Sequence, residues 1–206
     1  RSPLATMGAA LSIARRRATD PAVQEALDAL GGEVDRFVEL VSDLLEISRA
    51  EAGIVELHRE QVDPAELVRM VLAGSGHEDV PVLVDGSAPT SVAVDKRRLG
   101  QCLVNLLNNA RNYAGGATAV RVEGADDAVR IHVDDDGPGI PEHERGYVFE
   151  RFARGTTSQA PDAGPGTGLG LALVKEHVAL HGGTVSVSES PGGGARFTIE
   201  VPRVGP

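Results

Sequence analysis

The chain has little of several features that define other classes of protein. Its one cysteine, Cys102, excludes an intrachain disulfide framework and a cysteine-based zinc site. It has no tryptophan and only 3% aromatic residues, so a core must be built from Leu, Val, Ile and Ala. No apolar run approaches the ~18 residues that span a bilayer. Basic residues number 20 against 30 acidic ones, and this net charge of −10 argues against nucleic acid as the main partner.

What is present is an ordinary globular composition. The 206 residues are 41% apolar and 24% charged, which suits one large domain or two small ones. Cys102 is predicted to be a small buried hydrophobe on a helix. The opening residues, Arg1-Ser2-Pro3-Leu4, show neither an initiator methionine nor a signal peptide, so we expect a piece of a longer protein.

Residues 1–52 are predicted to form a helical hairpin. A helix over about 4–18 leads through a turn at Thr19-Asp20-Pro21 into a second helix over about 22–50. Along the second helix, apolar residues recur at alternating steps of three and four: Leu27, Leu30, Val34, Phe37, Val41 and Leu44. Two helices cannot bury such a stripe, so we expect dimerisation into a four-helix bundle. The alternative is that the hairpin packs on the rest of its own chain.

The remainder predicts an α+β sandwich, a mixed sheet covered on one face by helices. Helices are expected over about 65–73, 95–113 and 168–181. Period-two alternation predicts strands near 80–85, 120–122, 129–133, 184–188 and 195–201. Residues 134–167, rich in Gly, Pro, Asp and Thr, are too long for a structural turn and are typical of a functional loop.

Three short stretches of this second part are candidates for chemistry. Asn105 and Asn109 lie four residues apart on a helix, so their side-chain amides share a face. Neutral amide oxygens suit a Mg²⁺ ion whose charge is already balanced by the phosphates of a nucleotide. The stretch Asp134-Asp135-Asp136-Gly137-Pro138-Gly139-Ile140 follows a strand and offers a carboxylate beside glycines that allow close approach. Gly164 to Leu171 alternates glycines into a helix N-terminus, where N–H groups can cradle phosphate. Taken singly, each also fits a plain polar face, turn or loop.

The order of these stretches resembles the ATP-binding domain of bacterial sensor histidine kinases. The Asn pair, the Asp-x-Gly-x-Gly stretch, Phe149-Glu150-Arg151-Phe152 and Gly166-Thr167-Gly168-Leu169-Gly170-Leu171 match the N, G1, F and G2 boxes of that family in order. Arg1-Ser2-Pro3-Leu4 resembles the end of its H box. The resemblance implies a dimerisation and histidine-phosphotransfer hairpin over 1–52, a linker over 53–63 and an ATP-binding catalytic domain over 64–206.

The resemblance also implies an ATP and Mg²⁺ site drawn from all four motifs: Asn105, Asn109, Asn112, Tyr113, Asp135, Gly137, Gly139, Ile140, Arg154, Gly166, Thr167, Gly168, Leu169, Gly170 and Leu171. Within it, Asn109 would be the Mg²⁺ ligand, Asp135 would recognise adenine, and Arg154 would reach the phosphates. Residues 153–165 would form a lid over the nucleotide.

Two positions depart from the family's pattern. Asn112 stands where a basic residue is usual, and Arg111 points about 100° away around the helix. Ser2 stands where Thr or Asn supports dephosphorylation of the partner protein, which leaves phosphatase activity open; if the helix began here, Ser2 would instead be its N-cap.

The phosphoaccepting histidine of the family would lie three residues before Arg1. None of the six histidines present matches an H box, and each is expected to be a surface or strand residue: His58, His77, His132, His143, His177 and His181. The residues as printed are therefore expected to bind ATP and dimerise without phosphorylating themselves.

The resemblance implies the catalytic portion of a two-component sensor kinase. The γ-phosphoryl group of ATP would pass to a histidine and then to an aspartate of a response regulator receiver domain. This portion would be cytoplasmic and free of membrane contact, within a longer membrane-anchored protein. Two rivals stay open: another enzyme with the same kind of ATP pocket, and a degenerate kinase that serves as a dimeric sensor scaffold.

Overall fold

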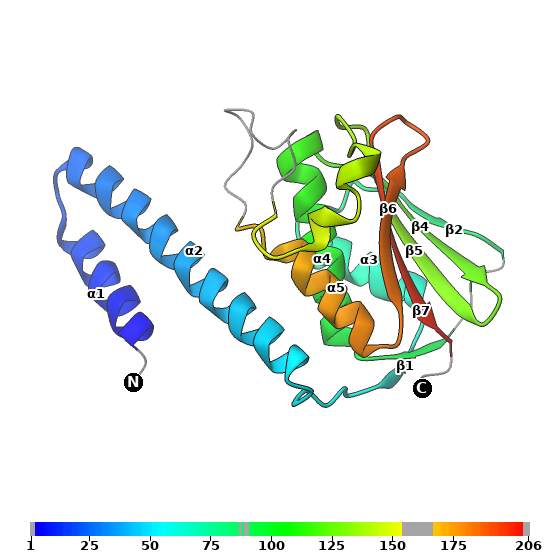
Figure 1. The fold of residues 1–206 in the computed structure, drawn as a ribbon. Coiled ribbons are helices and arrows are strands. Elements are labelled where there is room, and N and C mark those ends of the chain that lie inside the picture. Colours follow the sequence, from blue (N-terminus) through cyan, green and yellow to red (C-terminus); the bar gives the residue numbers. More distant parts are fainter. Residues whose placement is uncertain (1–2, 87, 89–90, 154–166, 204–206) are drawn as a thin grey trace. The chain divides into compact units, whose positions relative to one another are not determined.

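The computed structural model describes residues 3–86, 88, 91–153 and 167–203, which divide into two compact units (Figure 1). The division falls inside the second helix, between Glu46 and Ile47. The domain limits expected at residues 52 and 63 stay predictions. Among the described residues, no helix combines the length and apolarity needed to cross a membrane.

The first unit is the helical hairpin that the sequence predicts. Helix α1 covers Pro3–Arg17 and α2 covers Pro21–Glu51, without interruption at Gly31. A Cβ at Gly31 would collide with the Arg15 guanidinium, so the glycine makes room where the helices meet. The Arg15 Nε atom lies 2.9 Å from an Asp28 carboxylate oxygen, which ties α1 to α2. Part of the predicted apolar stripe stays exposed, including Leu30 at 53% and Phe37 at 54%.

The second unit is built on a five-stranded mixed sheet in the order β2-β4-β5-β7-β6. Its strands are β2 (Val82–Val84), β4 (Ala117–Ala125), β5 (Ala128–Asp135), β6 (Thr184–Glu189) and β7 (Ala195–Pro202). The β2–β4 pair is parallel and the other neighbours are antiparallel. A separate two-stranded sheet pairs β1 (Glu60–Val62) with β3 (Val92–Val94), a strand that the sequence analysis did not predict.

Three helices lie on one face of the five-stranded sheet (Figure 1), as the predicted fold class requires. They are α3 (Pro64–Gly74), α4 (Lys96–Ala114) and α5 (Gly170–Leu180). Two short 3-10 helices, Glu142–Glu144 and Tyr147–Phe149, interrupt the segment that was predicted to be loop. The start of α3 is as expected, because the Asp63 side chain accepts hydrogen bonds from the N–H groups of Ala65 and Glu66.

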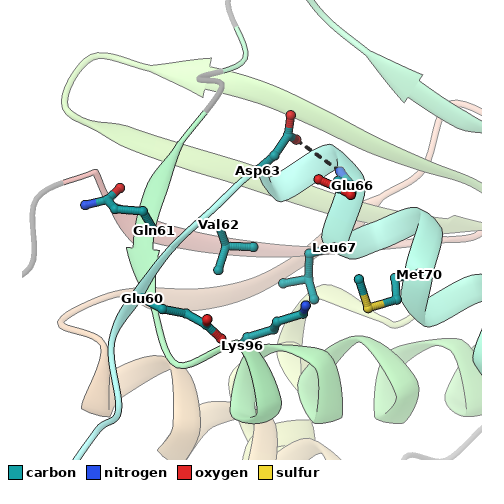
Figure 2. Close-up of a pocket in the computed structure, with 8 residues that line it drawn as sticks. All are labelled: Glu60, Gln61, Val62, Asp63, Glu66, Leu67, Met70 and Lys96. Atoms are coloured by element: carbon teal, nitrogen blue, oxygen red, sulfur yellow. Dashed lines mark hydrogen bonds between the residues drawn. The ribbon is translucent and has the colours of Figure 1, made fainter.

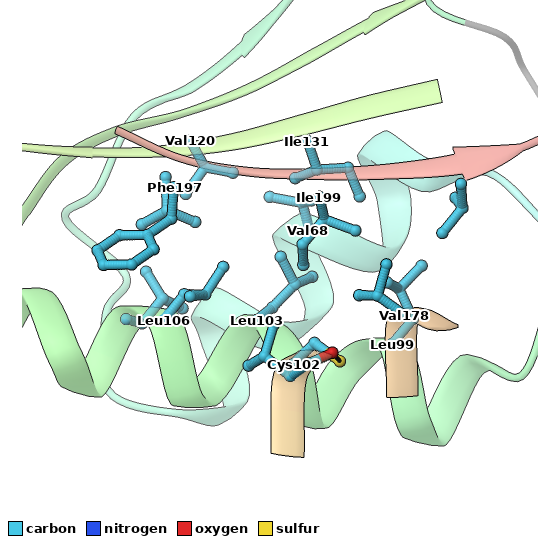
Figure 3. Packing of buried hydrophobic residues seen from close by; sticks show 14 of the residues in the cluster. Val68, Leu99, Cys102, Leu103, Leu106, Val120, Ile131, Val178, Phe197 and Ile199 are labelled. Carbon is cyan, nitrogen blue, oxygen red and sulfur yellow. Dashed lines mark hydrogen bonds between the residues drawn. The ribbon is translucent and has the colours of Figure 1, made fainter. Parts of the chain in front are cut away.

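The core lies between the helices and the inner face of the sheet (Figure 3). Alternate residues of β5 and β7, such as Ile131 and Phe197, meet Leu103 and Leu106 of α4, and all four are at most 1% exposed. Cys102 is buried in this layer, as expected for a small hydrophobe. The packing fixes the second half of α4 beside the end of β5 and the start of α5, which are the elements that carry the predicted motifs.

Candidate functional site

The second half of α4 presents a pair of half-buried amides. Asn105 and Asn109 are half-buried, whereas Asn108 and Asn112 on the adjoining face are exposed. The Asn105 Nδ2 atom donates to the carbonyl oxygen of Gly170, at 3.3 Å. The Asn pair therefore lies on the side of α4 that faces the N-terminus of α5.

The end of β5 sends two neighbouring carboxylates to opposite faces of the sheet. Asp135 is 5% exposed, and its Oδ1 atom accepts hydrogen bonds from the N–H groups of Gly137 at 3.0 Å and Ala195 at 2.9 Å. Asp134 binds Arg196 through both carboxylate oxygens, at 2.6 and 2.8 Å, and Arg121 at 3.0 Å. Burial favours a higher pKa for Asp134, but the hydrogen bonds from the two arginines outweigh it and hold the pKa below its usual value.

The glycines after β5 allow two close approaches. A Cβ at Gly137 would lie 2.6 Å from the Cβ of Ala114 and 3.2 Å from the carbonyl oxygen of Tyr113, so only glycine lets this segment pass the end of α4. Gly139 has φ +69°, a conformation that favours glycine, and lies against the carbonyl oxygens of the turn before β7. The segment is thus held between α4 and the last hairpin.

The segment that leads into α5 is held in place by Phe152, the last residue of the Phe149–Phe152 motif. Gly168 has φ +73°, and its carbonyl oxygen accepts a hydrogen bond from the N–H group of Phe152 at 2.9 Å. A Cβ at Gly168 would lie 2.9 Å from the Phe152 Cα atom. The Thr167 hydroxyl oxygen accepts from the N–H group of Leu169 at 3.3 Å, and Leu169 is fully buried. These contacts place Gly170 and the first N–H groups of α5 beside Asn105.

Most of the predicted site residues therefore come from three converging elements. Asn105, Asn109 and the half-buried Tyr113 come from α4. Asp135 ends β5 and is followed by Gly137, Gly139 and Ile140, and the segment from Thr167 to Leu171 leads into and begins α5. Asn112 is exposed at the C-terminal end of α4. Ser2, Arg154 and Gly166 lie outside the described residues.

One residue of this region, Ser190, was not among the residues that the sequence predicted for the site. Ser190 precedes the last hairpin turn and is buried at 5% exposure, with its hydroxyl 2.7 Å from the carbonyl oxygen of Asp135. A serine before Pro-Gly-Gly-Gly is typical of a turn, so only the pairing of strands reveals the contact. Phe152, the last residue of the predicted Phe149–Phe152 motif, has φ +60°, which is rare for a residue with a Cβ, and nothing in the sequence indicates this conformation.

The histidines correct one expectation. His77, His177 and His181 are neither surface nor strand residues; they are at most 5% exposed and lie in or just after helices. The His181 Nδ1 atom lies 2.7 Å from the carbonyl oxygen of His177, and its Nε2 atom accepts from the N–H group of Asp95 at 3.0 Å. Burial lowers the pKa of His181, and the nearby Arg59 and Arg98 act in the same direction.

A hollow of about 140 Å³ lies at the other end of α4 (Figure 2). It is formed by β1, α3 and Lys96, the first residue of α4. None of the predicted site residues lines it. Its wall consists of Glu60, Gln61, Val62, Asp63, Glu66, Leu67, Met70 and Lys96.

Two family models match the chain. Residues 94–205 match the model described as histidine kinase-, DNA gyrase B- and HSP90-like ATPase. Residues 1–53 match the His Kinase A (phospho-acceptor) domain. The first match covers more than half of the chain, and together the two matches cover the hairpin and most of the second unit.

Individual relatives agree with these matches. The chain is 38% identical over 212 residues to the sensor histidine kinase MtrB of Mycobacterium tuberculosis, with 99% of the chain and 37% of MtrB covered. It is 35% identical over 184 residues to the signal transduction histidine-protein kinase AfsQ2 of Streptomyces coelicolor, with 89% and 34% covered. The crystal structure of full-length ShkA in complex with AMPPNP has a TM-score of 0.77 at 30% identity, with 98% of the chain and 46% of ShkA covered. The chain thus spans about a third of the length of the curated relatives.

Proposed function

The chain belongs to the sensor histidine kinase family, and we propose that it is the catalytic portion of such a kinase. In this proposal, the second unit binds ATP with Mg²⁺, and the γ-phosphoryl group passes to a histidine of the dimerisation and phosphotransfer region. The observation that carries the proposal is the convergence of Asn105, Asp135 and Gly170 from three separate elements. The AMPPNP complex of ShkA supports the choice of nucleotide.

Asp135 is proposed to recognise the adenine base. Its Oδ1 atom is occupied by the N–H groups of Gly137 and Ala195, which fix the plane of the carboxylate. Its Oδ2 atom is then the acceptor for the 6-amino group of adenine. Gly139 and Ile140 would line the pocket of the base, and Tyr113 would pack near it.

The N-terminus of α5 is proposed to bind the phosphates. The first N–H groups of a helix have no partner within the helix and carry the positive end of its dipole, so they favour an anion. Gly168, whose positive φ favours glycine, and Gly170, the first residue of α5, lie at this end of the helix, and Thr167, Leu169 and Leu171 complete the segment. Arg154 and Gly166, by resemblance, would add a charge and a further N–H group.

The Asn pair fits a Mg²⁺ ion that travels with the nucleotide. Both side chains are half-buried amides without formal charge, and neutral oxygen ligands suit an ion whose charge is balanced by phosphates. Asn109 is proposed as the ligand. Asn105, whose amide donates to Gly170, would face the phosphates one turn earlier. Asn112 would lie at the edge of the site. The ion would neutralise charge on the transferred group while the protein holds the nucleotide in place.

The hairpin is proposed to supply the dimer and the partner surface. Its exposed apolar stripe favours a homodimer through residues 1–52, in which the hairpins form a four-helix bundle. Residues 1–52 contain no histidine, so the phosphoacceptor would be a histidine outside the printed residues. The printed residues alone would then not become phosphorylated from ATP. A response regulator receiver domain would be the next acceptor, and Ser2 would stand at a position that supports its dephosphorylation. The portion would act in the cytoplasm as part of a membrane-anchored protein.

Replacement of Asp135 tests the nucleotide site. Asp135→Asn keeps an oxygen for the two backbone N–H groups but presents an amide N–H group to the amino group of adenine. We expect ATP affinity, measured by calorimetric titration with Mg²⁺, to fall by about 5- to 150-fold, or about 1–3 kcal/mol. Asp136→Asn is the matched control, because the neighbouring Asp136 is exposed. Equal affinity of the two variants would show that adenine is placed wrongly.

A further inference from the structure

The turn between β6 and β7 closes directly on the end of β5. The Ser190 hydroxyl donates to the carbonyl oxygen of Asp135 at 2.7 Å. The same hydroxyl oxygen accepts hydrogen bonds from the N–H groups of Gly192 at 3.3 Å and Gly194 at 3.0 Å. A hydroxyl has one donor and two acceptor positions, so the three contacts use its full capacity. One buried side chain thus holds its own turn and the neighbouring strand together.

The same turn also contacts the carboxylate of Asp135. The Ala195 N–H group donates to Asp135 Oδ1 at 2.9 Å. Immediately before it, a Cβ at Gly194 would lie 2.6 Å from Asp135 Oδ1 and 2.7 Å from the backbone nitrogen of Gly137. The turn therefore packs against the carboxylate with no space for a side chain at Gly194. A shift of the turn would rotate or displace the carboxylate.

We propose that Ser190 is a positioning residue for base recognition. It fixes the turn so that the Ala195 N–H group holds Asp135 Oδ1, and the orientation of the carboxylate then determines how well adenine is distinguished from guanine. The inference rests on the proposed function, in which Asp135 accepts from the 6-amino group of adenine. Guanine carries a carbonyl oxygen at that position, so a well-oriented carboxylate disfavours it.

Base selectivity separates positioning from a merely structural role. Ser190→Ala removes the hydroxyl group. The carbonyl oxygen of Asp135 then loses its hydrogen-bond donor, and the N–H groups of Gly192 and Gly194 lose their acceptor. We expect ATP affinity to fall by about 5- to 10-fold, while GTP affinity, which depends on the triphosphate, changes by less than about twofold. Ser190→Thr keeps the hydroxyl and should retain the ATP preference of the wild type. Ser188→Ala, at an exposed position of β6, is the control and should change neither affinity.

The measurement is calorimetric titration of each variant with Mg²⁺–ATP and Mg²⁺–GTP, preceded by a thermal melt. If Ser190→Ala does not fold, Ser190→Cys keeps the volume with a weaker donor and is assessed in the same way. If Ser190→Ala leaves the ratio of ATP affinity to GTP affinity unchanged, whether or not both affinities fall, the inference is overturned. Asp135→Asn distinguishes failure of this inference from failure of the proposed function. If Asp135→Asn loses the preference for ATP over GTP and the Ser190 variants keep it, only the role of Ser190 is wrong. If Asp135→Asn keeps the selectivity, the placement of adenine fails.

Discussion

Gly137 offers a sharp test of how tightly the segment after β5 is held against α4. A Cβ at this position would lie 2.6 Å from the Ala114 Cβ, 3.1 Å from the Ala114 Cα and 3.2 Å from the Tyr113 carbonyl oxygen. Two of these atoms belong to the backbone, so no rotation of a side chain relieves the contact. Gly137→Ala must therefore displace the segment, the end of α4, or both.

The size of the effect follows from two opposing contributions. Overpacking by one methyl group costs about 1–3 kcal/mol. Loss of glycine freedom in the unfolded chain returns about 0.4–1 kcal/mol, because the observed φ of Gly137 is not positive. We expect a net decrease of about 1–2 kcal/mol in the free energy of unfolding. Since the Gly137 N–H group holds Asp135 Oδ1, ATP affinity should also fall by about 5- to 10-fold.

Urea unfolding and ATP titration measure both effects. Gly146→Ala is the matched control, because Gly146 has φ −76° and nothing within 4 Å of an added Cβ. Combining Gly137→Ala with Ala114→Gly removes the nearest obstacle and should recover part of both losses, with a coupling of about 1 kcal/mol. If Gly137→Ala matches Gly146→Ala in stability and affinity, the close packing of this segment on α4 is refuted.

Three further predictions concern the buried histidines, the hairpin and the metal. The pKa values of His77 and His181 are lowered from 6.5, mainly by burial, so stability is full above that pH and decreases as the pH falls toward the lowered values. Thermal melts between about pH 7.5 and about pH 5.5 should show this decrease in stability. A His181→Gln variant with the same pH dependence of stability as the wild type would contradict the assignment to His181. Phe37→Asp, at a 54% exposed position of α2, should convert the dimer to a monomer in light scattering, and an unchanged mass would rule out the stripe as the interface. Asn109→Ala should weaken ATP binding by about tenfold with Mg²⁺ but not with EDTA, and equal losses in both would remove Asn109 as the ligand.

Elements with a strong local pattern were predictable from the sequence. The start of α3 follows from Asp63 before Pro64, and β5 and β7 follow from strict alternation of apolar residues. Strand β3 was missed although Val92 and Val94 alternate, and it is held by its pairing with β1, which no local pattern indicates. The fold class was predictable because four ordered motifs carry the resemblance.

The supporting contacts of the site were not predictable. The contact of Ser190 with Asp135 joins residues 55 positions apart through the register of three strands. The buried His181 ring accepts a hydrogen bond from the N–H group of Asp95, which lies 86 positions away. No local periodicity reports such pairings, so a polar residue before a turn or after a helix is naturally expected at the surface. The roles of the predicted site residues stay predictions, to be decided by the variants above.

Phosphoryl transfer tests the central claim most directly. The chain, extended upstream to include a His-Glu-Leu segment, is incubated with Mg²⁺ and ATP labelled at the γ-phosphate. We predict a protein label that is lost in acid and kept in alkali, as expected for phosphohistidine, and that is strongly reduced by Asp135→Asn. A protein that binds ATP but takes up no label would contradict the kinase and support the dimeric scaffold.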